Sequence, residues 1–422
     1  MAPFLGCVAD DFTGATDVAG MLVRAGMRTV QMIGVPASAP PPDVDAIVVA
    51  LKSRTIAPAA AVEQSLAALR WLQEAGCRRS YFKYCSTFDS TDEGNIGPVA
   101  DALMSALRAG FTIACPAFPE AGRTIFKGYL FVGDVLLSES GMRHHPLTPM
   151  TDPSLVRVLQ RQTRRKVGLA DHAAVSGGWE RLRARFDELR RDGVEIAIVD
   201  ATSNDDLLAI GAACADLPLV TGGSGIALGL PPAWRGAGLL GTVGAADMLP
   251  RADGTRAIVA GSSSIATQGQ VAAALEEGMP AFRVDPLRLA AGEDVVGSAV
   301  DWAAPLLRRG PVLVYATAAP ERVREVQERL GRERAGELVE QALAAIARAL
   351  VERGVGRLIV AGGETSGAVI SALGVKGLRI GPQIAPGVPW TSTLGGRTLS
   401  LALKSGNFGG RDFFLRAWST LP

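Results

Sequence analysis

The sequence predicts an α/β fold with two domains, each built on a mainly parallel sheet, facing each other across a cleft. Three observations lead to this prediction. Short apolar segments of strand length alternate with segments of helical periodicity. A segment rich in glycine and proline, residues 231–254, separates two such series. The length of 422 residues is sufficient for two domains, which we place at residues 1–230 and 255–422 with 231–254 as linker.

The first series begins with an apolar strand at residues 4–9 that ends at Asp10-Asp11. A helix should follow, because Ala15, Val18 and Leu22 recur at helical spacing. The remaining expected elements are strands at residues 46–51, 80–84, 112–115 and 195–199, a helix at 57–75, and a hairpin at 129–137 that turns at Gly133-Asp134.

The second series repeats the alternation after the linker. Strands are expected at residues 257–260, 281–284, 312–316 and 358–361, with helices at 264–277 and 335–353. Because parallel strands are joined by helical crossovers, both series indicate mainly parallel sheets covered on two faces.

Charge and cysteine content exclude several classes of protein. The 43 basic and 42 acidic side chains nearly cancel, which gives no reason to expect nucleic acid as a partner. No apolar run of about 18 residues indicates a membrane span. The five cysteines are scattered without metal-ligand spacing, so we expect no metal site and a cytoplasmic protein. The sequence is compatible with a homodimer but does not specify one.

The segment after the first strand carries polar side chains at a strand-to-helix turn. Asp10 and Asp11 precede Thr13 and Gly14, and in a parallel sheet the loops beyond the strand ends form the ligand crevice. One of these side chains could simply cap the helix. Capping requires a single residue, however, so the surplus of carboxylates and hydroxyls favours a polar binding site.

A second polar cluster follows the strand at residues 80–84. Lys83 could neutralise a substrate carboxylate, and Arg54, after an earlier strand, could bind the same group through two hydrogen bonds. Each basic residue alone could be a solvated surface charge. The side chains we expect to bind substrate hydroxyls are Ser86, Asp89, Ser90 and Asn95.

Three turns rich in glycine mark the second series: residues 261–264 (GSSS), 362–366 (GGETS) and 404–410 (KSGNFGG). Small residues at strand-to-helix turns let backbone N–H groups approach phosphates. Any one of them could also be an ordinary tight turn. Neither a GxxxxGK[ST] nor a GxGxxG motif is present, so the markers of P-loop and dinucleotide-binding proteins are missing.

The segments ADDFTGATD, DSTDEGN, GGETS and SGNFGG, in this order, resemble the four-carbon acid sugar kinase family. The resemblance covers nearly the whole chain. It implies an N-terminal domain that binds a sugar acid and a C-terminal domain that binds ATP, with Mg²⁺ held mainly through ATP. The residues that it places at the nucleotide are Ser262, Gly362, Gly363, Glu364, Thr365, Ser405 and Gly406. Glu364 would either organise Mg²⁺ through water or hold the adenosine.

The segments FKYCSTFDSTDEGNIGP and FPEAGRT are similar to the branch of this family that phosphorylates the 4-hydroxyl of 3-oxo-tetronate. From their positions after the first strands, we expect Arg54 and Lys83 to hold the carboxylate of this acid, with Asp10 and Asp11 also in the substrate site. We expect Asp11 to orient or deprotonate the 4-hydroxyl, with Asp412 as its competitor.

Three alternatives remain open from the sequence. The chain could prefer threonate or erythronate as its substrate, or it could be a sugar-acid sensor without catalysis. A pyridoxal-phosphate enzyme is suggested by SGNFGG, but Lys404 lies directly beside this motif and little chain follows it.

Overall fold

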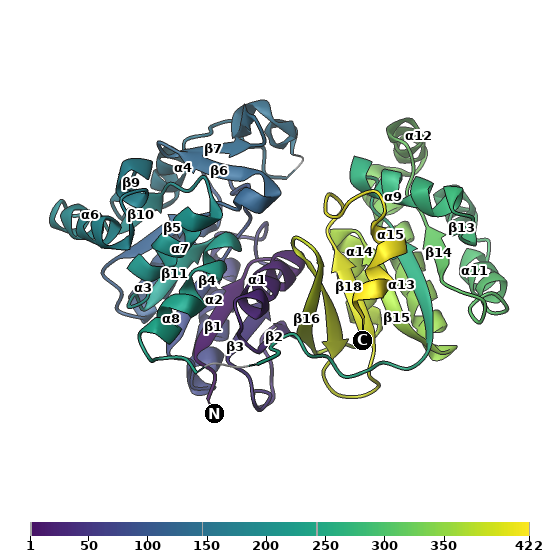
Figure 1. Cartoon of the computed structure of the whole chain (residues 1–422). Coiled ribbons are helices and arrows are strands. Elements are labelled where there is room, and N and C mark those ends of the chain that lie inside the picture. The colour runs from purple at the N-terminus through teal and green to yellow at the C-terminus, as the bar shows by residue number, and fades with distance from the viewer. Residues whose placement is uncertain (1, 146, 242–243, 422) are drawn as a thin grey trace. The chain divides into compact units, whose positions relative to one another are not determined.

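The structure is a computed structural model that describes residues 2–145, 147–241 and 244–421. The chain forms two compact units, Met1–Asp247 and Met248–Pro422, which we call unit 1 and unit 2 (Figure 1). Both contain mainly parallel strands with helices packed against them, so the predicted fold class is confirmed.

In unit 1, parallel strands are hydrogen-bonded in the order β2-β3-β1-β4-β11-β5-β10-β9. The central strand β1 has no polar side chain because both faces of the sheet are covered, and all five of its residues are buried. The bounds are β1 Leu5–Ala9, β2 Thr29–Ile33, β3 Ala46–Ala50, β4 Arg79–Lys83, β5 Thr112–Cys115, β9 Val167–Ala170, β10 Ile196–Val199 and β11 Leu219–Gly222. All five strands predicted for this region are present, whereas β2, β9 and β11 were not predicted.

Helices connect most of these strands, as parallel neighbours usually require, whereas β2 and β3 are joined by a loop without a helix. Helix α1 follows β1 directly and buries Ala15, Val18 and Leu22, the residues whose spacing predicted it. The bounds are α1 Phe12–Arg24, α2 Pro58–Glu74, α3 Ile96–Ala106, α4 Leu155–Gln162, α5 His172–Val175, α6 Trp179–Arg191, α7 Asn204–Ala213 and α8 Leu230–Gly236, with short 3₁₀ turns at Pro119–Ala121, Leu137–Glu139, Gly141–His144 and Gly225–Leu228.

A small antiparallel sheet, β6-β7-β8, interrupts the alternation in unit 1. The predicted hairpin is formed by β7 Tyr129–Val132 and β8 Val135–Leu136, and β6 Arg123–Phe126 adds a third strand. The buried carboxylate of Asp200 fixes the β6–β7 turn, because it accepts the backbone N–H groups of Lys127 (2.7 Å) and Gly128 (2.8 Å).

Unit 2 has the strand order β13-β14-β12-β15-β18-β17-β16. The first five strands in this order, β13, β14, β12, β15 and β18, are parallel to one another. Strand β17 is antiparallel to both of its neighbours, β18 and β16. The bounds are β12 Thr255–Ala260, β13 Ala281–Arg283, β14 Val312–Tyr315, β15 Val355–Ala361, β16 Gly377–Ala385, β17 Val388–Thr393 and β18 Ser400–Lys404; the helices are α9 Ile265–Glu276, α10 Pro286–Ala290, α11 Val295–Ala303, α12 Pro320–Leu330, α13 Arg332–Glu352, α14 Gly363–Ala372 and α15 Phe413–Arg416, with a 3₁₀ turn at Ala417–Thr420.

The antiparallel strands β16 and β17 were not predicted. Gly381 and Pro382 lie inside β16, and both residue types usually argue against a strand interior. The structure accommodates them through a shift in the pairing register between Ile380 and Gln383. The buried Trp390 of β17 then packs against the C-terminal residues, and its indole N–H donates to the carbonyl oxygen of Ala417 at 2.9 Å.

The segment predicted as linker, residues 231–254, begins inside α8. The buried Trp234 of this helix packs edge-on against Phe4 with ring centroids 4.9 Å apart, which attaches the helix to unit 1. Residues 242–243 of this segment lie outside the described residues. Across the described part of the chain, no helix is both long enough and apolar enough to cross a membrane.

Candidate active site

The polar residues of unit 1 emerge from three adjacent strand ends. Ala9 of β1 is paired with Ala50 of β3 on one side and with Lys83 of β4 on the other. The chain continues in register beyond the strands, since the N–H of Asp10 donates to the carbonyl of Lys83 at 3.0 Å. Parallel pairing therefore brings together side chains that are far apart in the sequence.

Arg54 is the hub of this cluster. Its guanidinium makes two hydrogen bonds to the Asp10 carboxylate, at 2.9 Å from Nε and 2.8 Å from Nη2. Nη2 also donates to Asp11 Oδ1 at 2.6 Å, and Nη1 lies 3.5 Å from Asp89 Oδ2. Burial alone would lower the pKa of Arg54, but Asp10 and Asp11 raise it well above its usual value. The sequence predicted that Arg54 binds a substrate carboxylate, whereas in this structure protein carboxylates occupy four of its donors.

Asp11 caps helix α1, which is one of the two roles that the sequence suggested. Its Oδ1 accepts the N–H of Gly14 at 3.1 Å, which caps α1, and its Oδ2 accepts the Thr13 hydroxyl at 2.9 Å. The side chain is nevertheless 26% exposed, against 8% for Asp10, so it is the more accessible of the two carboxylates. Burial works to raise the pKa of Asp11, but Arg54 and Lys83 outweigh it and hold the pKa below the usual range. Asp11 is therefore ionised at neutral pH.

Lys83 lies beneath the N-terminus of α1. It is 2% exposed, and its ammonium group donates to the carbonyl of Tyr84 at 2.6 Å. A Cβ atom at Gly14 would lie 2.8 Å from Lys83 Nζ and 2.2 Å from Asp11 Oδ1, which explains why the turn requires glycine. Lys83 is thus a buried positive charge directly beside the Asp11 carboxylate.

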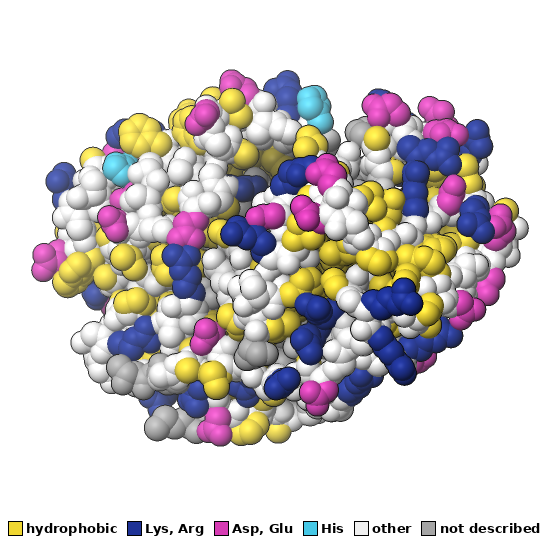
Figure 2. Space-filling view, turned by 45° about the vertical axis from the view of Figure 1, so that its right-hand side comes forward, with side chains coloured by type: hydrophobic (Ala, Val, Ile, Leu, Met, Phe, Trp, Pro, Cys, Tyr) yellow, Lys and Arg dark blue, Asp and Glu magenta, His cyan; other side chains and the backbone are white. Residues whose placement is uncertain are grey.

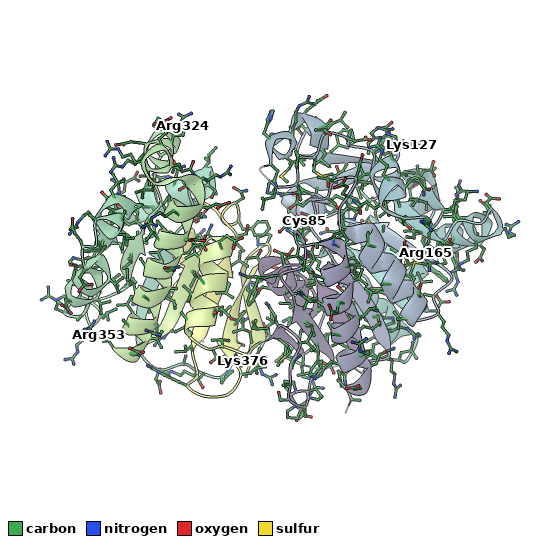
Figure 3. All side chains as sticks on the ribbon, turned by 180° about the vertical axis from the view of Figure 1, so that it is seen from behind. Cys85, Lys127, Arg165, Arg324, Arg353 and Lys376 are labelled. Carbon is green, nitrogen blue, oxygen red and sulfur yellow. The ribbon has the colours of Figure 1, made fainter. Side chains whose placement is uncertain are left out.

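The loop after β4 has a strained backbone. Phe88 and Asp89 both have positive φ, 65° and 27°, which is unusual for side chains other than glycine. The Thr87 hydroxyl donates to Asp89 at 2.6 Å and holds it toward Arg54. Figure 3 labels Cys85 in this loop, beyond the end of β4. This unusual backbone conformation places the Asp89 carboxylate beside Arg54 at the strand ends.

Two of the other predicted substrate residues make hydrogen bonds within the protein, and one of them supports the loop after β3 that carries Arg54. Asn95 donates its amide N–H groups to the carbonyls of Ser53, Arg54 and Ile56 at 2.7, 3.2 and 2.9 Å. Ser90 accepts a hydrogen bond of 2.8 Å from Gln162, a residue that sequence analysis did not identify. Ser86 is half-buried in the same loop and makes no side-chain hydrogen bond with the described residues.

A small cavity is enclosed by Asp10, Arg54, Asp89, Ser90 and Asn95. Its volume of about 10 Å³ holds roughly one water molecule. A four-carbon acid is therefore too large for this cavity. A ligand at these strand ends would contact the partly exposed carboxylate of Asp11 instead.

The three glycine turns of unit 2 also meet at adjacent strand ends. Ala361 of β15 is paired with Ala260 of β12 and with Lys404 of β18. Just beyond the strands, the N–H of Gly261 donates to Ala361 at 2.9 Å and that of Gly362 donates to Lys404 at 2.8 Å. The predicted nucleotide residues are therefore brought together in one place.

Close contacts fix the first turn to the third. The hydroxyls of Ser264 and Thr267 both donate to the carbonyl of Gly406, at 2.6 and 2.9 Å. A Cβ atom at Gly406 would lie 2.3 Å from Ser262 Oγ. Helices α9 and α14 begin at these turns, so their N-termini offer unpaired backbone N–H groups to an anion.

A cavity of about 360 Å³ lies beside the first two turns. Ser262, Gly362, Gly363, Glu364 and Thr365 line its polar end, whereas Ser405 and Gly406 lie behind Ser262 and Ser264. The opposite wall is apolar and comes from α12 and α13, through Val323, Val326, Ala335 and Val339, with Arg322 and Arg332 also in the lining. This wall was not predicted, because no helix was expected at residues 320–330 and the helical periodicity of residues 335–353 does not distinguish a cavity wall from a packed core.

The surface of unit 2 shows the same combination of side chains. In the right-hand half of Figure 2, hydrophobic side chains (yellow) are bordered by lysine and arginine side chains (dark blue). An apolar wall beside small-residue turns and helix N-termini suits a ligand with an aromatic base and phosphates.

Lys404 is a buried cation without an acidic partner among the described residues. It is fully buried at the end of β18, and Nζ donates to Thr267 Oγ1 (3.1 Å), Ser405 O (3.0 Å) and Gly406 O (2.9 Å). Burial lowers the pKa of Lys404 from 10.5 to about 7. The amine therefore fastens the third turn to α9 while it carries only part of its charge at neutral pH.

We predict that Lys404 makes the stability of the protein depend on pH. The Lys404 amine binds its proton more tightly in the unfolded chain than in the folded protein, so burial of this amine destabilises the fold wherever the unfolded chain carries that proton. This loss of stability is absent above pH 10.5, grows as the pH falls, and is complete below about pH 7. Between pH 7.5 and 9.5, the free energy of unfolding of the wild type should rise relative to Lys404→Met by on the order of 1 kcal/mol per pH unit. Chemical denaturation measures this difference.

The exposed Lys376 provides the matched control (Figure 3). Lys376→Met should follow the wild type across the same pH range. A Lys404→Met curve that stays parallel to the wild type would show that Lys404 keeps an ordinary pKa.

Family models match most of the chain. Residues 5–230 match a sugar-binding N-terminal domain, and residues 257–414 match a nucleotide-binding C-terminal domain. A 3-oxo-tetronate kinase of Cupriavidus necator is 63% identical over 98% of this chain and 96% of its own length. One of Burkholderia multivorans is 62% identical over 99% of this chain and 97% of its own length.

Two solved structures are also similar over almost the whole chain. A Haemophilus influenzae protein, HI1011, has a TM-score of 0.81 and 46% identity, covering 99% of this chain and all of its own. A Salmonella typhimurium LT2 protein, described provisionally as a tRNA synthase, has a TM-score of 0.90 and 44% identity, covering 99% of both chains. The chain therefore belongs to the four-carbon acid sugar kinase family, as its motifs predicted, and its relatives include proteins named 3-oxo-tetronate kinase.

Proposed function

We propose that this protein uses ATP to phosphorylate the 4-hydroxyl of 3-oxo-tetronate, which gives 3-oxo-tetronate 4-phosphate. The observation that carries the proposal is the convergence of three glycine turns beside a partly apolar cavity in unit 2. A sugar-acid sensor has no use for such a site. The 62–63% identity to 3-oxo-tetronate kinases over nearly full length supports the choice of substrate.

The proposal assigns one ligand to each domain. Residues 1–230 would bind the sugar acid and residues 255–422 would bind ATP, with 231–254 as linker. The polar strand ends around Asp11 in unit 1 and the cavity of unit 2 support this division. The partners are then a small acid and ATP, and the homodimer allowed by the sequence stays a prediction. A cytoplasmic location is supported by the five cysteines, all of which are free.

The phosphates of ATP would lie at the N-termini of α9 and α14. Gly363 and Thr365, in the first turn of α14, would supply backbone N–H groups, and Ser262 and Thr365 would supply hydroxyls. The N–H of Gly362 already donates to Lys404, so Gly362 would shape the turn, while Ser405 and Gly406 would hold the first turn in place. Phosphoryl transfer depends mainly on positioning and charge neutralisation, which these groups provide.

Magnesium fits this site as an ion bound mainly by ATP and water. Among the described residues, no group of three or more His, Cys, Asp or Glu side chains is arranged to hold a metal ion. Mg²⁺ keeps several water ligands and commonly binds through substrate phosphates. Glu364, exposed at the polar end of the cavity, would either hold such a water or contact the adenosine.

Asp11 would accept the proton of the 4-hydroxyl or orient its lone pair. It is ionised, partly exposed, and next to the buried Lys83. Its competitor Asp412 lies at the start of α15 with its side chain 54% exposed, and it pairs with Arg416 at 3.0 Å. An exposed carboxylate in an i,i+4 pair has little to hold it against a substrate. We therefore favour Asp11.

The test of the function is a coupled assay for ADP with several four-carbon acids. We expect ATP consumption with 3-oxo-tetronate at a kcat/KM far above that with threonate or erythronate. If threonate is the better substrate, the protein is a kinase of the other substrate branch. If none of these acids stimulates ATP consumption, the kinase assignment is wrong and the sensor hypothesis replaces it.

Asp11→Asn tests the catalytic assignment. Asparagine caps a helix as well as aspartate does, so the fold should persist while kcat falls about 10²- to 10⁴-fold. Because the pKa of Asp11 is lowered, wild-type kcat should show no acidic limb near neutral pH, where Asp11 is ionised. Asp412→Asn is the matched comparison, and a larger loss there than at Asp11 would reverse the assignment.

A further inference from the structure

The proposed substrate is an anion, and its carboxylate needs a cation that can receive it. Arg54 is badly placed for this purpose, since its guanidinium is enclosed by Asp10, Asp11 and Asp89. An incoming carboxylate would meet three negative charges around one positive charge. These three carboxylates would repel the carboxylate of the substrate, and four of the Arg54 donors that could offset the repulsion already bind them.

Arg123 is a different kind of cation at the same edge of the sheet in unit 1. It follows the loop after β5 and begins β6, and its backbone is tied to Phe118 by hydrogen bonds of 2.8 and 3.0 Å. The side chain is half-buried, and Nη1 donates to the carbonyl of Ala121. Nε is buried without a partner, and no described residue accepts a hydrogen bond from Nη2. Arg123 therefore has unused donors and no carboxylate paired with it among the described residues.

A buried acceptor without a partner lies in the same neighbourhood. Asp17 of α1 is 6% exposed; its Oδ2 accepts the hydroxyl of Ser224, whereas Oδ1 has no partner. Burial raises the pKa of Asp17, and the positive charges of Lys83 and Arg123 oppose that rise. Buried polar atoms are rarely left unpaired in a folded protein, and here a donor and an acceptor are unpaired in one cluster.

The loops that carry these residues are held together by backbone contacts. A Cβ atom at Gly223 would lie 2.5 Å from the carbonyl oxygen of Pro116, and one at Gly225 would lie 2.3 Å from that of Ala117. The loop after β5, which leads to Arg123, therefore packs directly on the loop that carries Ser224. Asp200 fixes the other end of β6 through the turn at Lys127. The position of Arg123 is thus set by the fold.

We infer that Arg123, rather than Arg54, receives the carboxylate of the sugar acid, and that Asp17 Oδ1 accepts the hydroxyl next to that carboxylate. The inference rests on the proposed function for its substrate. Arg54 then has a positioning role, because it holds Asp10, Asp11 and Asp89 in place. Lys83 is close to both Asp11 and Asp17, and its positive charge works to lower the pKa of both carboxylates. A four-carbon acid anchored at Arg123 and Asp17 can direct its far hydroxyl toward Asp11.

The test compares an acid with its neutral analogue. Erythrulose carries a hydroxymethyl group where 3-oxo-tetronate carries its carboxylate, and it keeps the ketone and the terminal hydroxyl. In Arg123→Met, kcat/KM for the acid should fall about 10- to 100-fold, mainly through KM, while the value for erythrulose should change less than about 3-fold. Arg54→Met should lower both values together, since it releases the carboxylates. Arg191→Met, on an exposed arginine of α6, should change neither.

Two further measurements separate this inference from the proposed function and from misfolding. Calorimetric binding of threonate, a stable four-carbon acid, should be lost in Arg123→Met and retained in Arg191→Met even if the wild type does not turn over any acid. Arg123→Lys, which keeps the charge but loses the planar fork, should recover part of the affinity for the acid. An Arg123→Met protein that loses acid and erythrulose equally, or neither, would overturn the inference. So would an Arg54→Met protein that loses the acid alone.

Discussion

The in-register pairing of parallel strands is the constraint on which both sites depend. Ala9 is aligned with Ala50 and Lys83 in unit 1, and Ala361 is aligned with Ala260 and Lys404 in unit 2. Side chains separated by 40 residues or more in the sequence therefore leave the sheet at one edge. A shift of one residue in either register would point these side chains to the opposite face. The apolar strands that build the core thus also determine which polar groups meet.

The two sites handle buried charge in different ways. In unit 1, Arg54 and Lys83 lie among carboxylates, so that opposite charges replace the lost hydration. In unit 2, the fully buried Lys404 donates to neutral oxygen atoms and has no acidic partner among the described residues, and burial lowers its pKa to about 7. The first arrangement keeps Asp11 ionised, as its proposed role toward the substrate hydroxyl requires. The second fastens a glycine turn at a cost in stability near neutral pH, because the buried amine gives up part of the charge that it would carry in the unfolded chain.

Much of the fold followed from local sequence, and the parts that did not have physical reasons. The strands at residues 112–115 and 129–132 were predicted at their observed bounds because apolar runs and a Gly133-Asp134 turn define them. The strand β16 could not be predicted, since Pro382 is tolerated only through a register shift that depends on β17. Local sequence also could not show that three carboxylates enclose Arg54, or that Asn95 supports the backbone of the loop that carries Arg54. Those roles depend on which strands are neighbours.

The most direct test of the account is amide hydrogen exchange on the intact protein with each ligand alone. A nonhydrolysable ATP analogue should slow exchange in residues 261–266, 362–366 and 404–408 of unit 2. Threonate should instead slow exchange in residues 10–14 and 84–90 of unit 1. Protection of the unit 1 segments by the nucleotide alone, or of the unit 2 segments by the acid alone, would contradict the assignment of one ligand to each set of strand ends.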